Sequence, residues 1–236
     1  MRRHALLLAL ATAAPAAAQQ EPEGERWRRE RERLVQEHII AAGVQDRATL
    51  DAVRSVPRHE FVPARERDRA YEDTPLPIGH GQTISQPSLV AMMTEMIRPR
   101  PGMRVLEVGT GSGYQAAVLA AAGARVWTIE IFAVLADEAR ARLARLGYDQ
   151  VHVRHGDGYA GWPEEAPFDA VVVTAAADDI PPALIDQLGP GGRLVMPVGA
   201  RDSDQALVFV QKDRTGRVSR RELLPVRFVP LLRGIR

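Results

Sequence analysis

The chain has 236 residues, 45% of them hydrophobic, a formal net charge of +1 at pH 7 and no cysteine. This length and apolar content are enough for one large domain with a substantial core. The near-neutral charge argues against a nucleic-acid-binding surface, and the lack of cysteine excludes disulfides, thiolate chemistry and cysteine-bound metal.

Residues 1–18 have the three regions of a secretory signal peptide in the right order. Met1–His4 is basic, Ala5–Ala14 is apolar but too short to span a bilayer, and Ala16–Ala18 supplies small residues for cleavage. We therefore expect a periplasmic or secreted protein with no membrane contact after cleavage. A miscalled start, which would leave the chain in the cytoplasm, and a disordered alanine-rich extension are the alternatives. Residues 19–25 are polar and predict a linker to a single domain at 26–236.

Two helices and a loop region come next. Apolar residues recur at helical spacing from Trp27 to about Ala42, and Asp46 fits the N-cap of a second helix through Val53. Residues 57–82 are proline-rich and have no steady period, so we expect loops there. A methionine-rich helix opens at Ile84-Ser85-Gln86-Pro87, and we interpret its methionines as core packing.

From Pro101 the pattern alternates between short apolar strands and helices. The predicted strands are 105–108, 125–129, 151–154, 170–173 and 193–197, and the helices between them are 114–122, 134–146 and 184–188. The turn residues 213–216 separate two further strands and predict a hairpin. Together these elements predict an α/β fold with a doubly wound, mostly parallel sheet, N-terminal helices and an antiparallel C-terminal hairpin.

The strongest chemical signal is the run from Val105 to Tyr114, VLEVGTGSGY, in which a buried strand leads through glycines into a helix. Glycines allow a sharp turn and let a ligand approach the main chain. Tyr114 stands where a nicotinamide-binding fingerprint needs its last glycine, and Thr110 stands where a hydrolase nucleophile elbow needs its first. The loop has no phosphate-binding lysine or arginine, which favours a sulfonium cofactor over a dinucleotide.

Carboxylates follow the next two predicted strands. Glu130 ends the second strand, where an acid can accept hydrogen bonds from both ribose hydroxyls of a nucleoside cofactor. Asp157 lies between Gly156 and Gly158 after the third strand, at the edge where open α/β sheets bind ligands. A surface glutamate and a plain turn are the alternatives for these positions. With the glycine loop, the two acids predict an adenosine pocket.

The wider sequence resembles protein-L-isoaspartate O-methyltransferases. The blocks that carry the resemblance run in the family's order from about Arg33 to Gly234, and they are VPRHEFV (56–62), LPIGHGQTISQP (76–87), RHGDG (154–158), FDAVVVTAA (168–176) and VRFVPL (226–231). The resemblance implies a Rossmann-like class I methyltransferase fold. It also implies transfer of a methyl group from S-adenosyl-L-methionine to the α-carboxylate of L-isoaspartyl residues in damaged proteins and peptides. Repair would follow through a succinimide that forms without the enzyme.

The resemblance also implies the site residues. Ser85 corresponds to the active-site serine, although a serine at this helix start is also a natural N-cap. The substrate groove would be lined by Thr83, Ile84, Ser85, Val226, Arg227 and Phe228. The cofactor would be held by Glu107, Gly109, Thr110, Gly111, Ser112, Gly113, Glu130, Asp157, Gly158 and Thr174. No metal site is expected, and His80 is interpreted as a polar loop residue.

The implied reaction needs little acid–base chemistry. An isoaspartyl carboxylate is already ionised at neutral pH, so no general base is required. The carboxylate and the sulfonium lose charge together, so a dry, aligned site helps most. Two alternatives stay open: a class I methyltransferase with another carboxylate or small-molecule acceptor, and a periplasmic module that binds damaged peptide without modifying it. We expect a monomer and no nucleic-acid partner.

Overall fold

The computed structural model describes residues 23–200 and 204–235. The signal peptide predicted at residues 1–18 lies outside this part of the chain and stays a prediction. Helix α1 (Glu23–Leu34) begins inside the stretch predicted to be a linker, so that prediction is wrong for residues 23–25. An acidic residue such as Glu25 is favourable in the first turn of a helix, which explains the earlier start.

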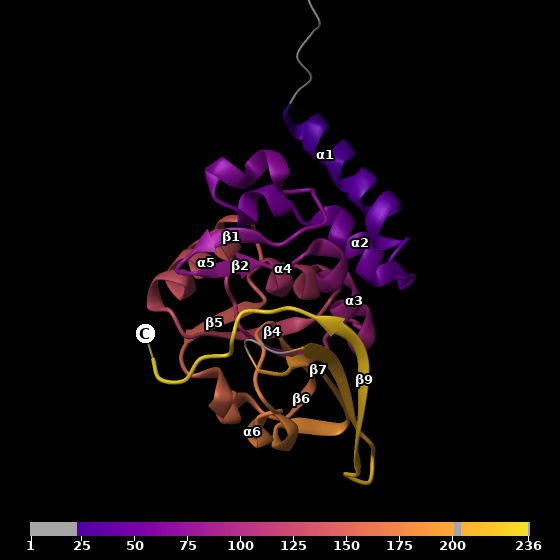
Figure 1. The fold of residues 1–236 in the computed structure, drawn as a ribbon, viewed down its shortest axis with the longest axis vertical. Coiled ribbons are helices and arrows are strands. Elements are labelled where there is room, and N and C mark those ends of the chain that lie inside the picture. The colour runs from indigo at the N-terminus through magenta and orange to yellow at the C-terminus, as the bar shows by residue number, and fades with distance from the viewer. Residues whose placement is uncertain (1–22, 201–203, 236) are drawn as a thin grey trace, which may run out of the picture.

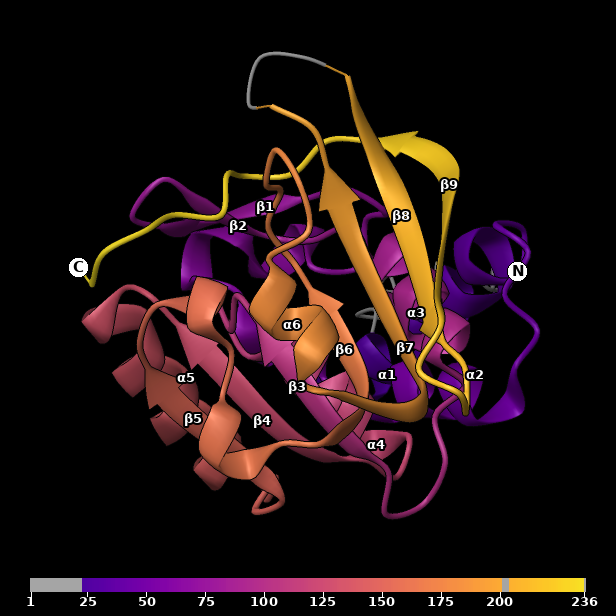
Figure 2. The ribbon, with the colours of Figure 1, turned by 90° about the horizontal axis from the view of Figure 1, so that it is seen from below.

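The N-terminal part packs over one side of the molecule as a small helical layer (Figures 1 and 2). Helix α1 continues as a π-helical turn, Val35–Ile39, and α2 (Arg47–Ser55) follows. Asp46 caps α2 as predicted, because its carboxylate accepts a hydrogen bond from the Thr49 N–H at 2.8 Å. Two 3₁₀ helices, Arg58–Phe61 and Ala64–Arg69, come next.

The loops predicted at 57–82 contain more structure than expected. Besides the 3₁₀ helices, strand β1 (Leu76–Gly79) pairs antiparallel with β2 (Gln82–Ile84). The turn between them is Gly79-His80-Gly81, all with positive φ. The sequence prediction missed this hairpin because its strands are too short to show an alternating pattern and one contains a proline.

The rest of the chain forms one sheet of seven strands within the described residues, in the order β5-β4-β3-β6-β7-β8-β9. The elements in chain order are α3 (Pro87–Ile97), β3 (Arg104–Val108), α4 (Tyr114–Ala121), β4 (Arg125–Glu130), α5 (Ala133–Arg145), β5 (Val151–His155), two 3₁₀ turns (Gly158–Ala160, Pro163–Glu165), β6 (Phe168–Val173), α6 (Pro182–Asp186), β7 (Leu188–Val198), β8 (Gln205–Lys212) and β9 (Val218–Val226). Strands β5, β4, β3, β6 and β7 run parallel, and β8 and β9 add the antiparallel hairpin. The predicted fold class is confirmed.

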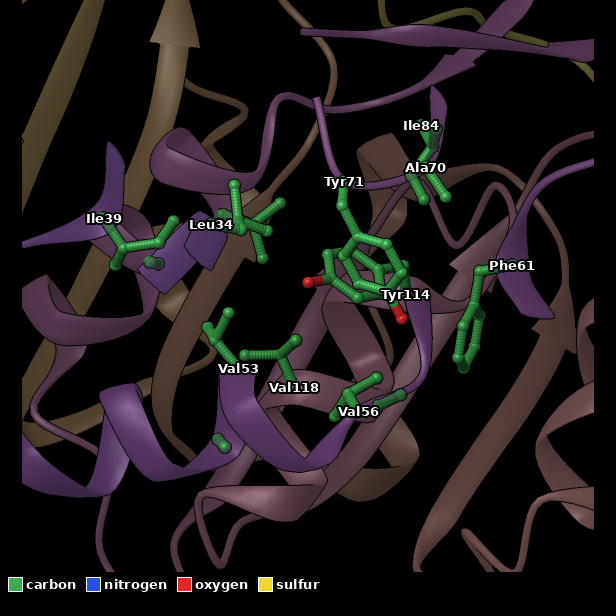
Figure 3. Packing of buried hydrophobic residues seen from close by; sticks show 14 of the residues in the cluster. Leu34, Ile39, Val53, Val56, Phe61, Ala70, Tyr71, Ile84, Tyr114 and Val118 are labelled. Carbon is green, nitrogen blue, oxygen red and sulfur yellow. The ribbon is translucent and has the colours of Figure 1, made fainter. Parts of the chain in front are cut away.

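Side chains of alternate strand residues enter two cores on opposite faces of the sheet. Val105 packs with helices α3 and α4, whereas its neighbour Leu106 packs in the cluster that includes Leu184 of α6. A third core lies between the N-terminal layer and α4, where Phe61 and Tyr71 surround Tyr114 (Figure 3). The sheet is thus covered on both faces. None of the described helices combines the length and apolar content that crossing a membrane requires.

Candidate active site

A cavity opens at the carboxyl ends of β3, β4 and β6, where the glycine loop leaves β3. Most of the predicted cofactor residues line it, namely Glu107, Gly109, Thr110, Gly111, Ser112, Glu130, Gly158 and Thr174. The chain after β9 passes over this edge and closes one side (Figures 1 and 2). It is held there by Ala176, whose N–H donates to the Val229 carbonyl at 2.8 Å and whose carbonyl accepts from the Leu231 N–H at 2.6 Å.

The glycine loop is tied to both neighbouring strands. Gly109, with φ of 99°, donates its N–H to the Ile129 carbonyl at 2.9 Å. Its own carbonyl accepts a hydrogen bond from the Thr174 hydroxyl at 2.6 Å. A Cβ on Gly109 would lie 2.4 Å from that hydroxyl oxygen, so only glycine fits here without displacement. The loop therefore has a fixed main-chain path along the cavity.

Glu130 connects the end of β4 to this loop. One carboxylate oxygen accepts the Gly111 N–H at 2.7 Å, and the other accepts the Phe132 N–H at 3.1 Å. The residue is 4% exposed and lines the cavity. A carboxylate oxygen has more than one lone pair, so both oxygens can still accept a hydrogen bond from a bound hydroxyl group.

Glu107 is the most unusual group in the cavity wall. It is fully buried, and neither carboxylate oxygen has a hydrogen-bond partner within the described residues. Burial raises the pKa of Glu107 to about 8, and the charge of Glu130 adds to the increase, while the nearby Thr128 hydroxyl and Ala116 amide offset it only in part. A buried, unpaired acid of this kind is typical of a site that binds a cation or a hydrogen-bond donor.

Gln115 belongs to the same wall and was missed by the sequence analysis. Its amide nitrogen donates to the Thr94 hydroxyl at 2.8 Å, but its Oε1 is buried and has no partner in the described part of the chain. The one available signal was a glutamine inside the otherwise apolar run of α4. With Glu107 it gives the cavity three unsatisfied acceptor atoms.

Ser85 lies where this cavity meets a second one. The second cavity is lined by Val226, Arg227 and Phe228, and it shares Thr83, Ser85 and Thr174 with the first. The predicted substrate residues therefore lie together, with Ile84 on the cofactor side only.

The alternative role of Ser85 as an N-cap is not what the structure has. Helix α3 has Gln86 at its N-cap position and no side-chain cap there. Asp73 binds the start of the helix instead, accepting the Ser88 N–H at 2.8 Å and the Gln86 side-chain amide at 2.9 Å. The Ser85 side chain is left to face the two cavities.

Two predicted cofactor residues lie outside the cavity lining. Asp157 uses its carboxylate on the main chain, accepting the Tyr159 N–H at 2.9 Å and the Gly234 N–H at 3.1 Å. Gly113 is at the N-cap of α4, against Leu143. Further lining residues, which the sequence pattern did not indicate, come from β2, the end of β4 and the C-terminal segment: Gln82, Ile131, Phe132, Pro230, Leu231 and Leu232.

Comparisons with known proteins agree with this geometry. The family model described as protein-L-isoaspartate(D-aspartate) O-methyltransferase matches residues 29–235. A protein-L-isoaspartate O-methyltransferase of Opitutus terrae is 57% identical over 204 residues, covering 86% of this chain and 87% of the relative. Protein-L-isoaspartate O-methyltransferase 2 of a Polaromonas species is 60% identical over 186 residues, covering 79% and 88%.

A solved structure extends the comparison to the cofactor. A Plasmodium falciparum protein crystallised with S-adenosyl-L-homocysteine superposes with a TM-score of 0.74 at 26% identity, covering 88% of this chain and 99% of that one. Sequence relatives, a family model over nearly the whole described chain and a matching fold thus point the same way. The chain belongs to the protein-L-isoaspartate(D-aspartate) O-methyltransferase family.

Proposed function

We propose that this chain methylates the α-carboxylate of L-isoaspartyl residues in damaged proteins and peptides, using S-adenosyl-L-methionine, and so starts their repair through a succinimide. The observation that carries this proposal is the position of Ser85 between two adjoining cavities. One cavity suits a nucleoside cofactor and the other is open enough for a polypeptide. A methyl group can pass between ligands held on either side of this serine.

The residues of the first cavity fit S-adenosyl-L-methionine. Glu130 would accept hydrogen bonds from its ribose, and the main chain from Gly109 to Ser112 would lie along it. The buried acceptors of Glu107 and Gln115 suit the ammonium group of its amino-acid portion, since a cation would compensate an otherwise unpaired carboxylate. When bound, this cofactor supplies a methyl group on a positively charged sulfur. Asp157 supports the turn at Gly158, because its carboxylate accepts the Tyr159 N–H.

The second cavity would hold the isoaspartyl residue, with Ser85 as a catalytic residue. Its hydroxyl makes no hydrogen bond within the described residues, so it is free to donate to one oxygen of the α-carboxylate. That bond would aim the other oxygen toward the first cavity. Thr83 and the strand end at Val226–Phe228 would position the substrate main chain.

The direct test is methyl transfer from labelled S-adenosyl-L-methionine to paired peptides that contain isoaspartate or aspartate at one position. We expect base-labile label on the isoaspartyl peptide alone, because only there is the α-carboxylate of the varied residue free, whereas in the aspartyl peptide it forms the peptide bond. Transfer to neither peptide with cofactor binding intact would indicate another acceptor. Loss of cofactor binding in folded protein would favour a module that only binds peptide.

Ser85→Ala tests the assigned role. We expect turnover to fall roughly tenfold to a hundredfold, the range for losing a hydrogen bond to a charged group. The cofactor Kd should stay nearly unchanged, since Ser85 only borders the cofactor cavity. Steady-state kinetics and a binding titration measure the two effects. Ser219→Ala, an exposed change on β9, is the matched control. Equal turnover in the Ser85 and Ser219 variants would remove Ser85 from the reaction.

A further inference from the structure

Two cavities lie one after the other along the seam between helix α3 and edge strand β9. Leu89, Met92 and Met96 lie on one face of α3, and Leu224 and Val226 lie on β9 beside them, all half-buried against the same core. Figures 1 and 2 both show α3 and β9 side by side. The cavity next to Ser85 is lined by Leu89, Met92, Leu224 and Val226, and the next cavity along is lined by Met96 and Leu223. We call these two neighbouring cavities together the α3–β9 groove.

Two methionines of α3 line the groove. Met93 is buried, as the core-packing interpretation predicted, but Met92 and Met96 are only half-buried. Their flexible side chains can adapt to different apolar groups, which suits a surface that meets many protein clients. The floor of the groove therefore offers apolar contact without a fixed shape.

Three arginines gather at the end of the groove far from Ser85. Arg98 follows α3, Arg193 lies on β7 and Arg221 lies on β9, and all three line the same cavity. Strand register places Arg193 and Arg221 on the same face, because they lie opposite Gln211 and Phe209, which are two residues apart on the intervening strand β8. The Arg221 guanidinium lies over the Phe209 ring, 5.4 Å from its centroid.

None of these three arginines forms an ion pair within the residues that the structure describes. Arg193 donates to the Ile97 carbonyl at 3.2 Å, which satisfies a helix end but does not neutralise charge. The pKa of Arg193 is lowered, first by burial and then by the like charges of Arg98 and Arg100. Glu95 lines the same cavity, and its Oε1 accepts hydrogen bonds from the Gln45 and Asp46 N–H groups at 2.7 and 2.5 Å. Its charge offsets one of the three arginines and leaves the cavity lining positive. The cluster is thus suited to an anion from outside.

We propose that the α3–β9 groove binds the polypeptide on one side of the isoaspartyl residue, and that Arg98, Arg193 and Arg221 bind an acidic side chain on it. This inference rests on the proposed function and adds a substrate preference to it. The groove follows β9 from Val226 to Arg221, a span of about 17 Å at roughly 3.3 Å per residue. An extended substrate would place its acidic residue about five positions from the isoaspartate.

A peptide scan tests this preference. Isoaspartyl peptides would carry one glutamate at successive positions on either side, each compared with its glutamine counterpart. An exposed ion pair changes affinity by roughly twofold, so two to three pairs should give the glutamate peptide a kcat/KM about fourfold to eightfold higher at the matching position. High salt should remove most of this advantage. The variant Arg98→Gln/Arg221→Gln keeps only Arg193 of the three, so the ratio should fall to about twofold or less.

Arg214→Gln/Arg217→Gln is the matched control, because it also removes two positive charges, from the exposed β8–β9 turn outside the groove. It should keep the wild-type ratio. The variant Arg221→Glu should favour an isoaspartyl peptide with lysine at the matching position over the peptide with glutamate. This comparison does not depend on the stability of the variant, since both peptides meet the same protein. Equal rates for glutamate and glutamine peptides at every position would overturn the inference while leaving the proposed function intact. No transfer to any isoaspartyl peptide would overturn both.

Discussion

Gly109→Ala should lower cofactor affinity at least tenfold and destabilise the fold by about 3 kcal/mol. The added Cβ would lie 2.4 Å from the Thr174 hydroxyl oxygen, and φ at this position is +99°. That hydroxyl now donates to the Gly109 and Val108 carbonyls, so relieving the clash would also break the contact between the glycine loop and β6. Both ligand-facing segments would shift together.

The comparison variant is Gly147→Ala, which separates the effect of backbone strain from the effect of the clash with Thr174. Gly147 also has a positive φ, +79°, but nothing lies within 4 Å of the position of its Cβ. It should cost about 1 kcal/mol through backbone strain alone and leave cofactor affinity unchanged. Urea unfolding and a binding titration give both quantities for each variant. Equal effects in the two variants would show that the contact with Thr174 does not hold the loop.

The fold was largely predictable because its parallel strands are buried on both faces. A strand such as β6 then appears as an unbroken apolar run between breakers, and the helices between strands keep their own period. The errors fall where this signal is absent. Strand β7 begins at Leu188, before its predicted start at Arg193. The glycines at 189–192 indicated a loop, but the strand continues through them because its register with β6 shifts there.

The site was predictable where function depends on position along a strand. The glycine loop and Glu130 follow directly from the ends of β3 and β4, and they lie in one cavity. Residues that arrive from distant segments had no such signal: Gln115 looks like any helical glutamine, and Val229–Leu232 enters through hydrogen bonds to Ala176. Asp157 shows the converse case, since its strand-end position was predicted but its carboxylate is bound by Tyr159 and Gly234.

Glu107 should make the free protein less stable as pH rises from about 5 to 8. In the folded chain burial raises its pKa to about 8, from 4.5 for an unperturbed glutamate. The folded state therefore holds a proton that the unfolded state releases above pH 4.5. The stability that this proton gives is complete below pH 4.5 and is lost as pH rises toward 8, at up to about 1.4 kcal/mol per pH unit.

Glu107→Gln removes the titrating group and keeps the shape of the side chain. The free energy of unfolding, measured by urea at pH 5.5 and pH 8, should fall by about 2–3 kcal/mol more in the wild type than in this variant. Glu37→Gln, an exposed change of the same kind, should behave as the wild type. Saturating S-adenosyl-L-homocysteine should flatten the wild-type dependence, because a cationic amino group beside Glu107 would favour its ionised form. If the pH dependence of unfolding stays the same with that ligand bound, the amino group lies elsewhere. If the wild type and Glu107→Gln have the same pH dependence without ligand, Glu107 is not the group that titrates.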